Sequence, residues 1–377
     1  MKLEELETPA LVLDRGRLER NIARMREHLA RLGVGLRPHV KTAKSMDVVR
    51  LALAGQPGGI TVSTLKEAEY FFAHGVRDIL YAVGIAPNKL DHVVALRRAG
   101  AEVTVLVDSV AAAQALAACG RAHGMDLPAL IEIDSDGHRS GVSPDDEALL
   151  RIGAVLDLER GATLRGVMTH AGGSYDCRSA GAILALAGQE RAAAVACAAA
   201  LRGAGLPCPV VSVGSTPTAT YADSFEGVTE VRAGVYMFFD LVMAGLGVCA
   251  LDDIALSVLA TVIGHQPRKN RIVTDAGWMA LSRDRGTAKQ WRDQGYGVVC
   301  DVHGVPLDGL VVSETSQEHG IVTSRSGGTV DCTRFPLGTQ LRILPNHACA
   351  TAAQHSRYHV VDGGTTVEAV WERFGGW

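Results

Sequence analysis

Short apolar runs alternate with longer helical stretches over the first 240 residues, and this alternation limits the folds open to the chain more than any other feature. The runs rich in β-branched and apolar residues predict eight strands, at Gly35–Val40, Ile60–Ser63, Ile79–Val83, Val103–Val107, Ala129–Asp134, Leu164–His170, Val210–Val213 and Thr229–Val235. Between them lie amphipathic stretches typical of helices, among them Leu65–His74, Lys89–Ala99, Val110–His123 and Gly188–Ala204. Eight strand–helix units predict a closed parallel (β/α)8 barrel of the TIM type rather than an open sheet.

The pattern changes after residue 250, where short alternating runs are separated by Pro, Gly and Asp. These runs predict further strands at Ala255–Ile263, Arg271–Asp275, Gly297–Asp301, Leu307–Ser313, Gln340–Leu344 and Tyr358–Val361. They indicate an antiparallel β domain, which the strand-like segment Thr8–Asp14 is expected to join. We therefore expect an α/β chain with a barrel over residues 15–245 and a β domain over residues 246–377, to which residues 1–14 add a strand.

The composition excludes several classes of protein. Hydrophobic residues make up 47% of the 377 residues, which is enough for a large core and argues against disorder. The net charge is −4 and no basic stripe occurs, so neither nucleic acid nor a membrane is an expected partner. The sequence lacks an evident apolar run of ~20 residues, and its acidic start lacks a signal-like apolar region, which favours a cytoplasmic protein. The eight cysteines have no framework spacing and are expected to be reduced.

Polar residues follow several predicted strands, at the end of a (β/α)8 barrel where active sites are built. Lys41 follows the first strand, where its amine would enter the barrel mouth and suit a Schiff base; a surface lysine is the alternative. Gly214, Ser215 and Thr216 follow the seventh strand and suit a phosphate, although such a loop often only caps a helix. Gly234 adds a backbone donor position after the eighth strand. Together these residues predict a pyridoxal phosphate site.

A second group of residues follows a predicted strand of the β domain, where Pro345 and Asn346 lead into His347, Ala348 and Cys349. In an extended segment residues i and i+2 face the same way, so the imidazole and the thiolate would hold one metal ion. Two protein ligands leave positions open for water or substrate, and a nitrogen–sulfur pair favours zinc. An ordinary histidine beside a buried cysteine is the alternative.

Three further residues of the β domain could belong either to the site or to the solvated surface. Arg283 and Arg285 would suit a substrate carboxylate, because a guanidinium binds it through two hydrogen bonds. His319 would add a titratable group near the site. Solvated surface positions explain all three equally well.

The motifs together resemble a known family, the fold-type III pyridoxal phosphate enzymes that include D-serine dehydratases and D-threonine aldolases. The segments that carry the resemblance are Thr8–Val12, Arg37–Thr42, Thr61–Thr64, Asp136–Gly141, Gly214–Thr218 and Pro345–Cys349. The resemblance implies an alanine-racemase-like fold of a barrel followed by a β domain. It also implies that Lys41 forms the Schiff base with the cofactor. His347 and Cys349 match the pair that holds a divalent metal, with zinc expected first and manganese, cobalt or magnesium as alternatives.

The resemblance assigns the other cofactor residues by position. The residues that fall where the family holds the phosphate are Gly214, Ser215, Thr216, Gly234 and Tyr236. Tyr175 matches a side chain that approaches the pyridine ring, and Arg139 matches one that approaches the phenolic oxygen. Members of this fold type are often dimers, so a homodimer is expected.

The second metal ligand separates the branches of this family. Aldolases tend to carry a carboxylate where this chain has Cys349, whereas dehydratases carry cysteine. The segments Ser282–Gly286, Gln317–Gly320 and Ile343–Thr351 are most similar to the D-threo-3-hydroxyaspartate dehydratase branch. The resemblance thus implies a lyase that converts D-threo-3-hydroxyaspartate or D-serine into a 2-keto acid and ammonia. An aldolase that releases glycine and an aldehyde is the main alternative; racemisation needs no metal, and a non-catalytic cofactor carrier would lack the β domain.

Overall fold

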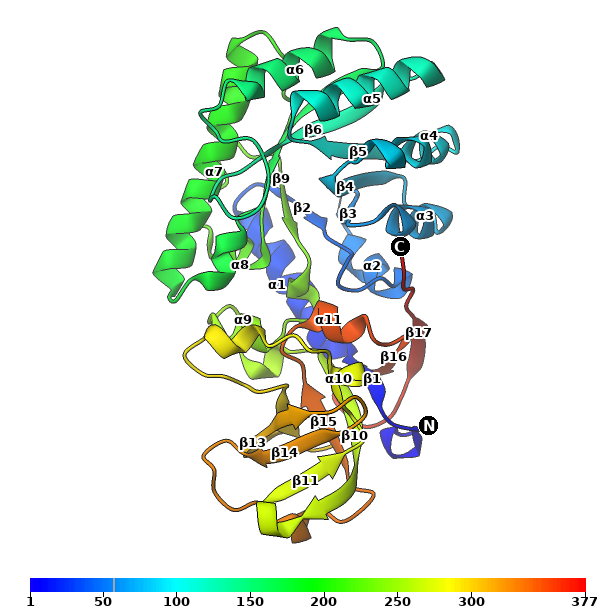
Figure 1. The fold of residues 1–377 in the computed structure, drawn as a ribbon, viewed down its shortest axis with the longest axis vertical. Coiled ribbons are helices and arrows are strands. Elements are labelled where there is room, and N and C mark those ends of the chain that lie inside the picture. The colour runs from blue at the N-terminus through cyan, green and yellow to red at the C-terminus, as the bar shows by residue number, and fades with distance from the viewer. Residues whose placement is uncertain (57) are drawn as a thin grey trace. The chain divides into compact units, whose positions relative to one another are not determined.

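The computed structural model describes residues 1–56 and 58–377, which form two compact units (Figure 1). Unit 1 comprises Met1–Arg24, Thr42–Leu51 and Val235–Gly375, and unit 2 comprises Met25–Lys41, Ala52–Gly234 and Gly376–Trp377. The domain boundaries that the sequence suggests at residues 14/15 and 245/246 stay predictions.

Unit 2 contains an eight-stranded parallel sheet with the strand order β2-β9-β8-β7-β6-β5-β4-β3. Its strands are β2 (Gly35–Pro38), β3 (Ile60–Val62), β4 (Asp78–Gly84), β5 (Glu102–Val107), β6 (Leu127–Ile133), β7 (Ala162–Thr169), β8 (Val210–Val213) and β9 (Glu230–Ala233). A parallel bridge between His39 and Thr61 joins the two outer strands and nearly closes the barrel. The predicted (β/α)8 barrel is confirmed, and each of its eight strands lies within a few residues of its predicted position.

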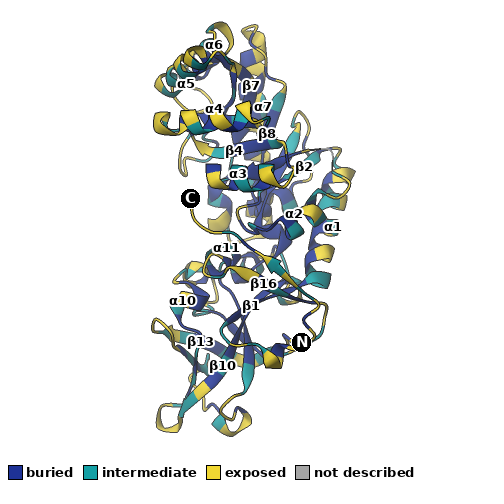
Figure 2. Ribbon diagram, turned by 90° about the vertical axis from the view of Figure 1, so that its right-hand side faces the viewer, coloured by how far each residue is buried: buried dark blue, intermediate teal, exposed yellow. Residues whose placement is uncertain are grey.

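Helix α1 (Arg15–Arg31) leads into β2 and the other helices connect these strands, and several helix ends follow local sequence signals. The others are α2 (Met46–Leu53), α3 (Leu65–Ala73), α4 (Leu90–Arg98), α5 (Val110–His123), α6 (Ala148–Leu158), α7 (Ala180–Gly203) and α8 (Thr216–Tyr221). For example, the Ser109 hydroxyl accepts a hydrogen bond from the Ala112 N–H at the start of α5, and Gly124 ends the helix at φ +65°. The strands are largely buried, whereas α4, α5 and α6 carry both buried and exposed residues (Figure 2).

Helix α7 is longer than the sequence suggested. It begins at Ala180 rather than Gly188, because the Ser179 hydroxyl accepts a hydrogen bond from the Ala182 N–H and caps the helix there. By length and composition alone, its 24 residues, with a mean hydropathy of 1.3 over an 18-residue window, would suffice to cross a membrane, which corrects the expectation that no apolar stretch reaches this length. In the structure α7 packs against β7 and β8 and carries the buried Glu190, which are features of a barrel helix.

One side of the barrel interior is polar. Arg37 on β2 donates two hydrogen bonds to Asp78, at 3.0 and 2.9 Å, and a third to Glu230 at 2.7 Å. Glu230 also accepts a hydrogen bond from Ser212, whose hydroxyl is 2.7 Å from Arg232. The other side is apolar, with a cluster formed by Leu80, Leu106, Leu130 and Met168. Alternate residues of β2 and β9 thus place a chain of paired charges inside the barrel.

Unit 1 contains a nine-stranded sheet with the order β11-β14-β13-β12-β15-β10-β1-β16-β17, in which β11 also pairs with β10. Its strands are β1 (Ala10–Asp14), β10 (Leu256–Gln266), β11 (Arg271–Thr274), β12 (Val298–Cys300), β13 (Pro306–Thr315), β14 (Gly320–Ser324), β15 (Gln340–Leu344), β16 (Arg357–Val361) and β17 (Ala369–Glu372). The expected addition of the N-terminal strand is confirmed: β1 runs antiparallel to β10 and parallel to β16. The sequence missed β14 and β17.

Three short helices, α9 (Leu241–Gly245), α10 (Trp278–Leu281) and α11 (Ala348–Ala352), interrupt the strands of unit 1. The N–H of Leu241 donates to the Pro345 carbonyl at 3.0 Å, so α9 lies beside the segment that leads into α11. No disulfide forms within residues 1–56 and 58–377, which hold all the cysteines.

Candidate active site

The predicted cofactor lysine lies beside two histidines of unit 2. Lys41 follows β2, and its side chain is exposed. Burial, reinforced by the charge of Lys41, lowers the pKa of His39 far below its usual value. Burial likewise lowers the pKa of His170 to about 3, with a smaller contribution from Lys41. The amine is therefore near two imidazoles that are neutral at pH 7, so they do not add positive charge to its surroundings.

Three of the predicted cofactor residues surround His170. Its Nδ1 lies 3.0 Å from the carbonyl oxygen of Gly214, and its ring centroid lies 6.4 Å from that of Tyr175. The charge of Arg139 also contributes to the lowered pKa of His170, so this guanidinium lies nearby. Sequence reasoning did not select His170, although it ends the sixth predicted strand, and strand ends are where barrel sites form.

The predicted phosphate loop joins β8 to α8. Gly214 has φ +129°, and a Cβ there would lie 2.3 Å from the carbonyl oxygen of Arg232, so only glycine fits. Ser215 and Thr218 cap α8 reciprocally: each backbone N–H donates to the other residue's hydroxyl. The loop thus caps a helix, as the alternative interpretation of its sequence predicts. Pro217 carries no N–H and the Thr218 N–H donates within this cap, so phosphate binding at the start of α8 stays a prediction.

A buried carboxylate fixes this loop. Glu190 of α7 is 1% exposed, and its Oε1 accepts hydrogen bonds from the N–H groups of Ala171, at 2.9 Å, and Gly214, at 3.0 Å. One side chain therefore connects the loop after β7 to the loop after β8. Burial raises the pKa of Glu190. This role cannot be inferred from local sequence, because the bonded residues lie 19 and 24 positions away.

Replacing Glu190 with leucine is expected to destabilise unit 2. It would leave two buried N–H groups without an acceptor, at a cost of about 1–3 kcal/mol each. The thermal unfolding midpoint should fall by about 5 °C or more. Glu190→Gln keeps the oxygen that accepts both bonds and should stay within about 2 °C of the wild type. Equal midpoints for the two variants would contradict this role.

The residues at this end of the barrel fit pyridoxal phosphate. Lys41 supplies an amine for covalent attachment, and the hydroxyl groups of Ser215 and Thr216 at the start of α8 would suit a phosphate. Two buried polar atoms nearby, His39 Nδ1 and Thr61 Oγ1, have no hydrogen-bond partner in the described part of the chain, so polar groups of a ligand would satisfy them. Gly234 is buried directly after β9.

Tyr236, the remaining predicted phosphate residue, belongs to unit 1. It lies in the 3-10 helix Val235–Met237, two residues after Gly234, and is fully buried.

The two predicted metal ligands lie at the start of α11 in unit 1. The expectation of an extended segment is wrong: His347 is the N-cap of α11, and Cys349 is in its first turn. His347 itself keeps an extended backbone, with φ −134° and ψ 109°. The two side chains still meet. They share a hydrogen bond, which together with the charge of Cys349 raises the pKa of His347.

Acidic groups surround His347. Its Nδ1 lies 2.6 Å from Asp284 Oδ2, and the hydroxyl of Thr42 lies 3.2 Å from Cys349 Sγ. Asp240, fully buried, accepts a hydrogen bond from the Ala348 N–H at 2.9 Å. Burial alone would lower the pKa of His347, but Cys349 and Asp284 outweigh it and raise the pKa to about 11. Such surroundings attract a cation, and the nitrogen and sulfur donors fit zinc.

Asp284 contacts a predicted metal ligand, and sequence reasoning did not select it. Its neighbours Arg283 and Arg285, considered for carboxylate binding, lie over the rings of Trp278 and Tyr296, at 4.1 and 5.1 Å. A metal-binding histidine usually bonds a carboxylate through its other ring nitrogen, as His347 bonds Asp284 here.

His319, the third open residue, is exposed in the hairpin between β13 and β14. This position agrees with the alternative that His319 is a solvated surface residue.

Two family descriptions match most of the chain. "Alanine racemase, N-terminal domain" matches residues 13–242, which include the predicted cofactor residues, and "Putative serine dehydratase domain" matches residues 255–361, which include the predicted metal ligands.

The chain is similar over almost its whole length to known enzymes. It is 58% identical to a D-threo-3-hydroxyaspartate dehydratase of Delftia sp. (strain HT23), covering 99% of this chain and 98% of the relative. It is 30% identical to a D-serine dehydratase of Dictyostelium discoideum, covering 97% and 96%. A 3-hydroxy-D-aspartate aldolase of Paracoccus denitrificans (strain Pd 1222) is 31% identical, covering 98% and 92%.

The fold agrees with a solved structure of D-threo-3-hydroxyaspartate dehydratase from Delftia sp. HT23. The TM-score is 0.98 at 57% identity, and the match covers 100% of both chains. Two solved variants of a D-threo-3-hydroxyaspartate dehydratase replace a histidine and a cysteine two positions apart, and the cysteine variant is in the metal-free form. The chain described here belongs to the D-serine dehydratase-like family of lyases, in which an alanine-racemase-like barrel is joined to a serine dehydratase domain.

Proposed function

We propose that this chain is a dehydratase, dependent on pyridoxal phosphate and a divalent metal, that converts D-threo-3-hydroxyaspartate, and secondarily D-serine, into a 2-keto acid and ammonia. The 58% identity to a D-threo-3-hydroxyaspartate dehydratase supports this substrate class. Cys349 supports the dehydratase branch, since aldolases of the family tend to carry a carboxylate at that position.

The observation that carries the proposal is the link between Lys41 and Thr42. The Thr42 hydroxyl lies 3.2 Å from the sulfur of Cys349. Consecutive Cα atoms are about 3.8 Å apart, so the chain attaches the proposed cofactor lysine directly to a residue that contacts a proposed metal ligand. A single reaction that needs both a lysine-bound cofactor and a metal is consistent with this connection.

The cofactor would be held by Lys41 and by the residues Arg139, Tyr175, Gly214, Ser215, Thr216, Gly234 and Tyr236. Pyridoxal phosphate, when bound, would supply an electron sink for loss of the substrate Cα proton. The Lys41 amine is the proposed base for the Cα proton. Neutral His39 and His170 add no charge beside that amine, and Glu190 holds the loop at Gly214 in place.

His347 and Cys349 would hold the metal, for which we propose zinc, with manganese, cobalt or magnesium as alternatives. The ion would act as a Lewis acid on the β-hydroxyl group and make it a better leaving group. Asp284 orients the His347 ring through Nδ1 and leaves Nε2 as the ligand atom. Asp240 holds the first N–H of α11 and so positions the Cys349 turn.

We also propose a cellular compartment, an oligomeric state and a class of partner for the enzyme. It would act in the cytoplasm as a homodimer on a small D-amino acid, with neither nucleic acid nor a membrane as partner. Its net charge of −4 agrees with the last point.

The products of the reaction test the proposed function. The metal-loaded holoenzyme, incubated with D-threo-3-hydroxyaspartate, D-serine and D-threonine separately, should release 2-keto acid and ammonia in equal amounts. The rate should be highest with D-threo-3-hydroxyaspartate. The L-isomers serve as controls and should not react.

Glycine and an aldehyde from the same incubation would instead identify an aldolase. The 31% identity to a 3-hydroxy-D-aspartate aldolase keeps this second candidate open to test. That result would also show that Cys349 does not mark the dehydratase branch.

A further inference from the structure

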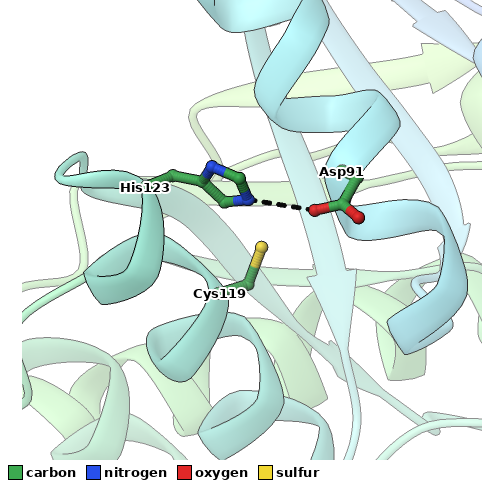
Figure 3. Close-up of side chains that lie close together, drawn as sticks. All are labelled: Asp91, Cys119 and His123. Atoms are coloured by element: carbon green, nitrogen blue, oxygen red, sulfur yellow. Dashed lines mark hydrogen bonds and ion pairs between the residues drawn. The ribbon is translucent and has the colours of Figure 1, made fainter.

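A cluster of three metal-ligating side chains lies on the helices of unit 2, apart from the residues assigned above. Cys119 and His123 belong to α5, and Asp91 belongs to α4. One ligand atom of each lies within 4.8 Å of the other two. Figure 3 shows the Cys119 sulfur pointing toward the hydrogen bond between His123 and Asp91. The three donors therefore converge on one point.

The helices dictate this arrangement. Residues four apart share one face of a helix, so Cys119 and His123 project side by side from the last turns of α5. Asp91 lies in the first turn of α4, which packs against α5. His123 Nε2 lies 3.0 Å from Asp91 Oδ1. The ligand atoms of a tetrahedral zinc site are about 3.4 Å apart, so a small side-chain movement would admit the ion.

We propose that Asp91, Cys119 and His123 form a second metal site, which binds one divalent transition-metal ion of the zinc or cobalt type. Sulfur and imidazole donors select such ions over magnesium and calcium. The thiolate and the carboxylate together balance the two charges of the ion. Three protein ligands leave a fourth position for water, and Asp91 is 86% exposed, so that position faces solvent. The bound ion would tie α4 to α5.

The contacts of Cys119 and His123 bear on how the site would bind an ion. Burial raises the pKa of the Cys119 thiol, which would lose its proton to the solvent when it binds the ion. Arg98 lies 3.3 Å from both His123 Nδ1 and the His123 carbonyl oxygen. Because arginine only donates, Nδ1 accepts, and the proton of the ring is on Nε2, facing Asp91.

Arg98 therefore opposes the ion. An imidazole that binds metal through Nε2 carries its proton on Nδ1, where it cannot accept from Arg98. The guanidinium also repels a cation. Removing Arg98 should strengthen metal binding, whereas it would have no such effect if the three side chains were merely a hydrogen-bonded surface cluster.

Cobalt(II) titration of the full-length holoenzyme tests the site. The Cys349→Ala background removes the other proposed metal-binding thiol, and the comparison with Cys119→Ala in that background assigns the remaining thiolate-to-cobalt absorption. We expect one equivalent to bind with this absorption and with the intense visible bands of a tetrahedral ion. Adding Cys119→Ala should abolish the absorption, His123→Ala should weaken binding at least tenfold, and Arg98→Ala should strengthen it severalfold.

Native protein provides a second measurement that needs no change at Cys349. Wild-type holoenzyme should bind one more equivalent of zinc than Cys119→Ser, while the two have the same dehydratase activity. Equal zinc content in these proteins, or cobalt spectra unaffected by Cys119→Ala, would overturn the proposal. So would an Arg98→Ala variant that binds no more tightly than its parent.

Discussion

Replacing Lys41 with alanine is expected to lower kcat/KM for the D-amino acid substrate by at least about four orders of magnitude. The variant loses both the amine that attaches the cofactor and the proposed base for the Cα proton, and each of these roles alone is worth about 10²–10⁴-fold. Cofactor should also cease to be trapped covalently by borohydride. Both quantities can be measured on one preparation, by a coupled keto-acid assay and by the cofactor that remains after denaturing gel filtration.

Lys66→Ala is a suitable control for this experiment. Lys66 belongs to α3 of the same unit and is exposed, with a surface ion pair to Glu69 at 3.1 Å. Such pairs contribute little, so the control should keep wild-type activity and covalent cofactor. Full activity in Lys41→Ala, or trapped cofactor at a different lysine, would exclude Lys41 from its proposed role.

The barrel could be predicted because its signal is local. Most strands of unit 2 are short runs rich in apolar residues, and several of the helices between them end in glycine, as α5 does at Gly124. Chemistry at strand ends then follows from the fold, which is why Lys41 and Gly214 could be selected before any contact was known. One of the two strands missed in unit 1, Gly320–Ser324, has a weak pattern, because glycine and polar residues take three of its five positions.

The residues that support the site could not be predicted, because their partners are distant in the chain. Asp284 bonds a histidine 63 positions away, and Glu190 bonds Gly214 across 24 positions. The orientation of Cys349 was misjudged for a local reason: α11 begins right after the strand, so an i, i+2 argument for extended chain does not apply. The two side chains nevertheless meet, because a histidine at the N-cap and a cysteine in the first turn lie close together.

Replacing Cys349 with alanine is expected to remove one equivalent of bound metal and to lower kcat by about three orders of magnitude. Only His347 would remain as a proposed ligand, and Lewis-acid stabilisation of a leaving oxygen is worth several kcal/mol. Metal content after dialysis, measured by atomic emission, and the keto-acid assay give the two numbers. Added zinc should not restore activity, because the missing ligand cannot be replaced by mass action at practical concentrations.

Asp284→Asn separates ligand loss from ligand orientation. The amide can still bond His347 Nδ1 but carries no charge, so we expect metal affinity to fall about 10–100-fold and activity to return at high zinc. Cys332→Ala is the matched control: Cys332 is a partly exposed thiol whose sulfur lies 3.8 Å from the Arg271 carbonyl oxygen, and its loss should change neither quantity. If added zinc failed to restore the activity of Asp284→Asn, as expected for Cys349→Ala, Asp284 would bind the ion itself rather than orient His347.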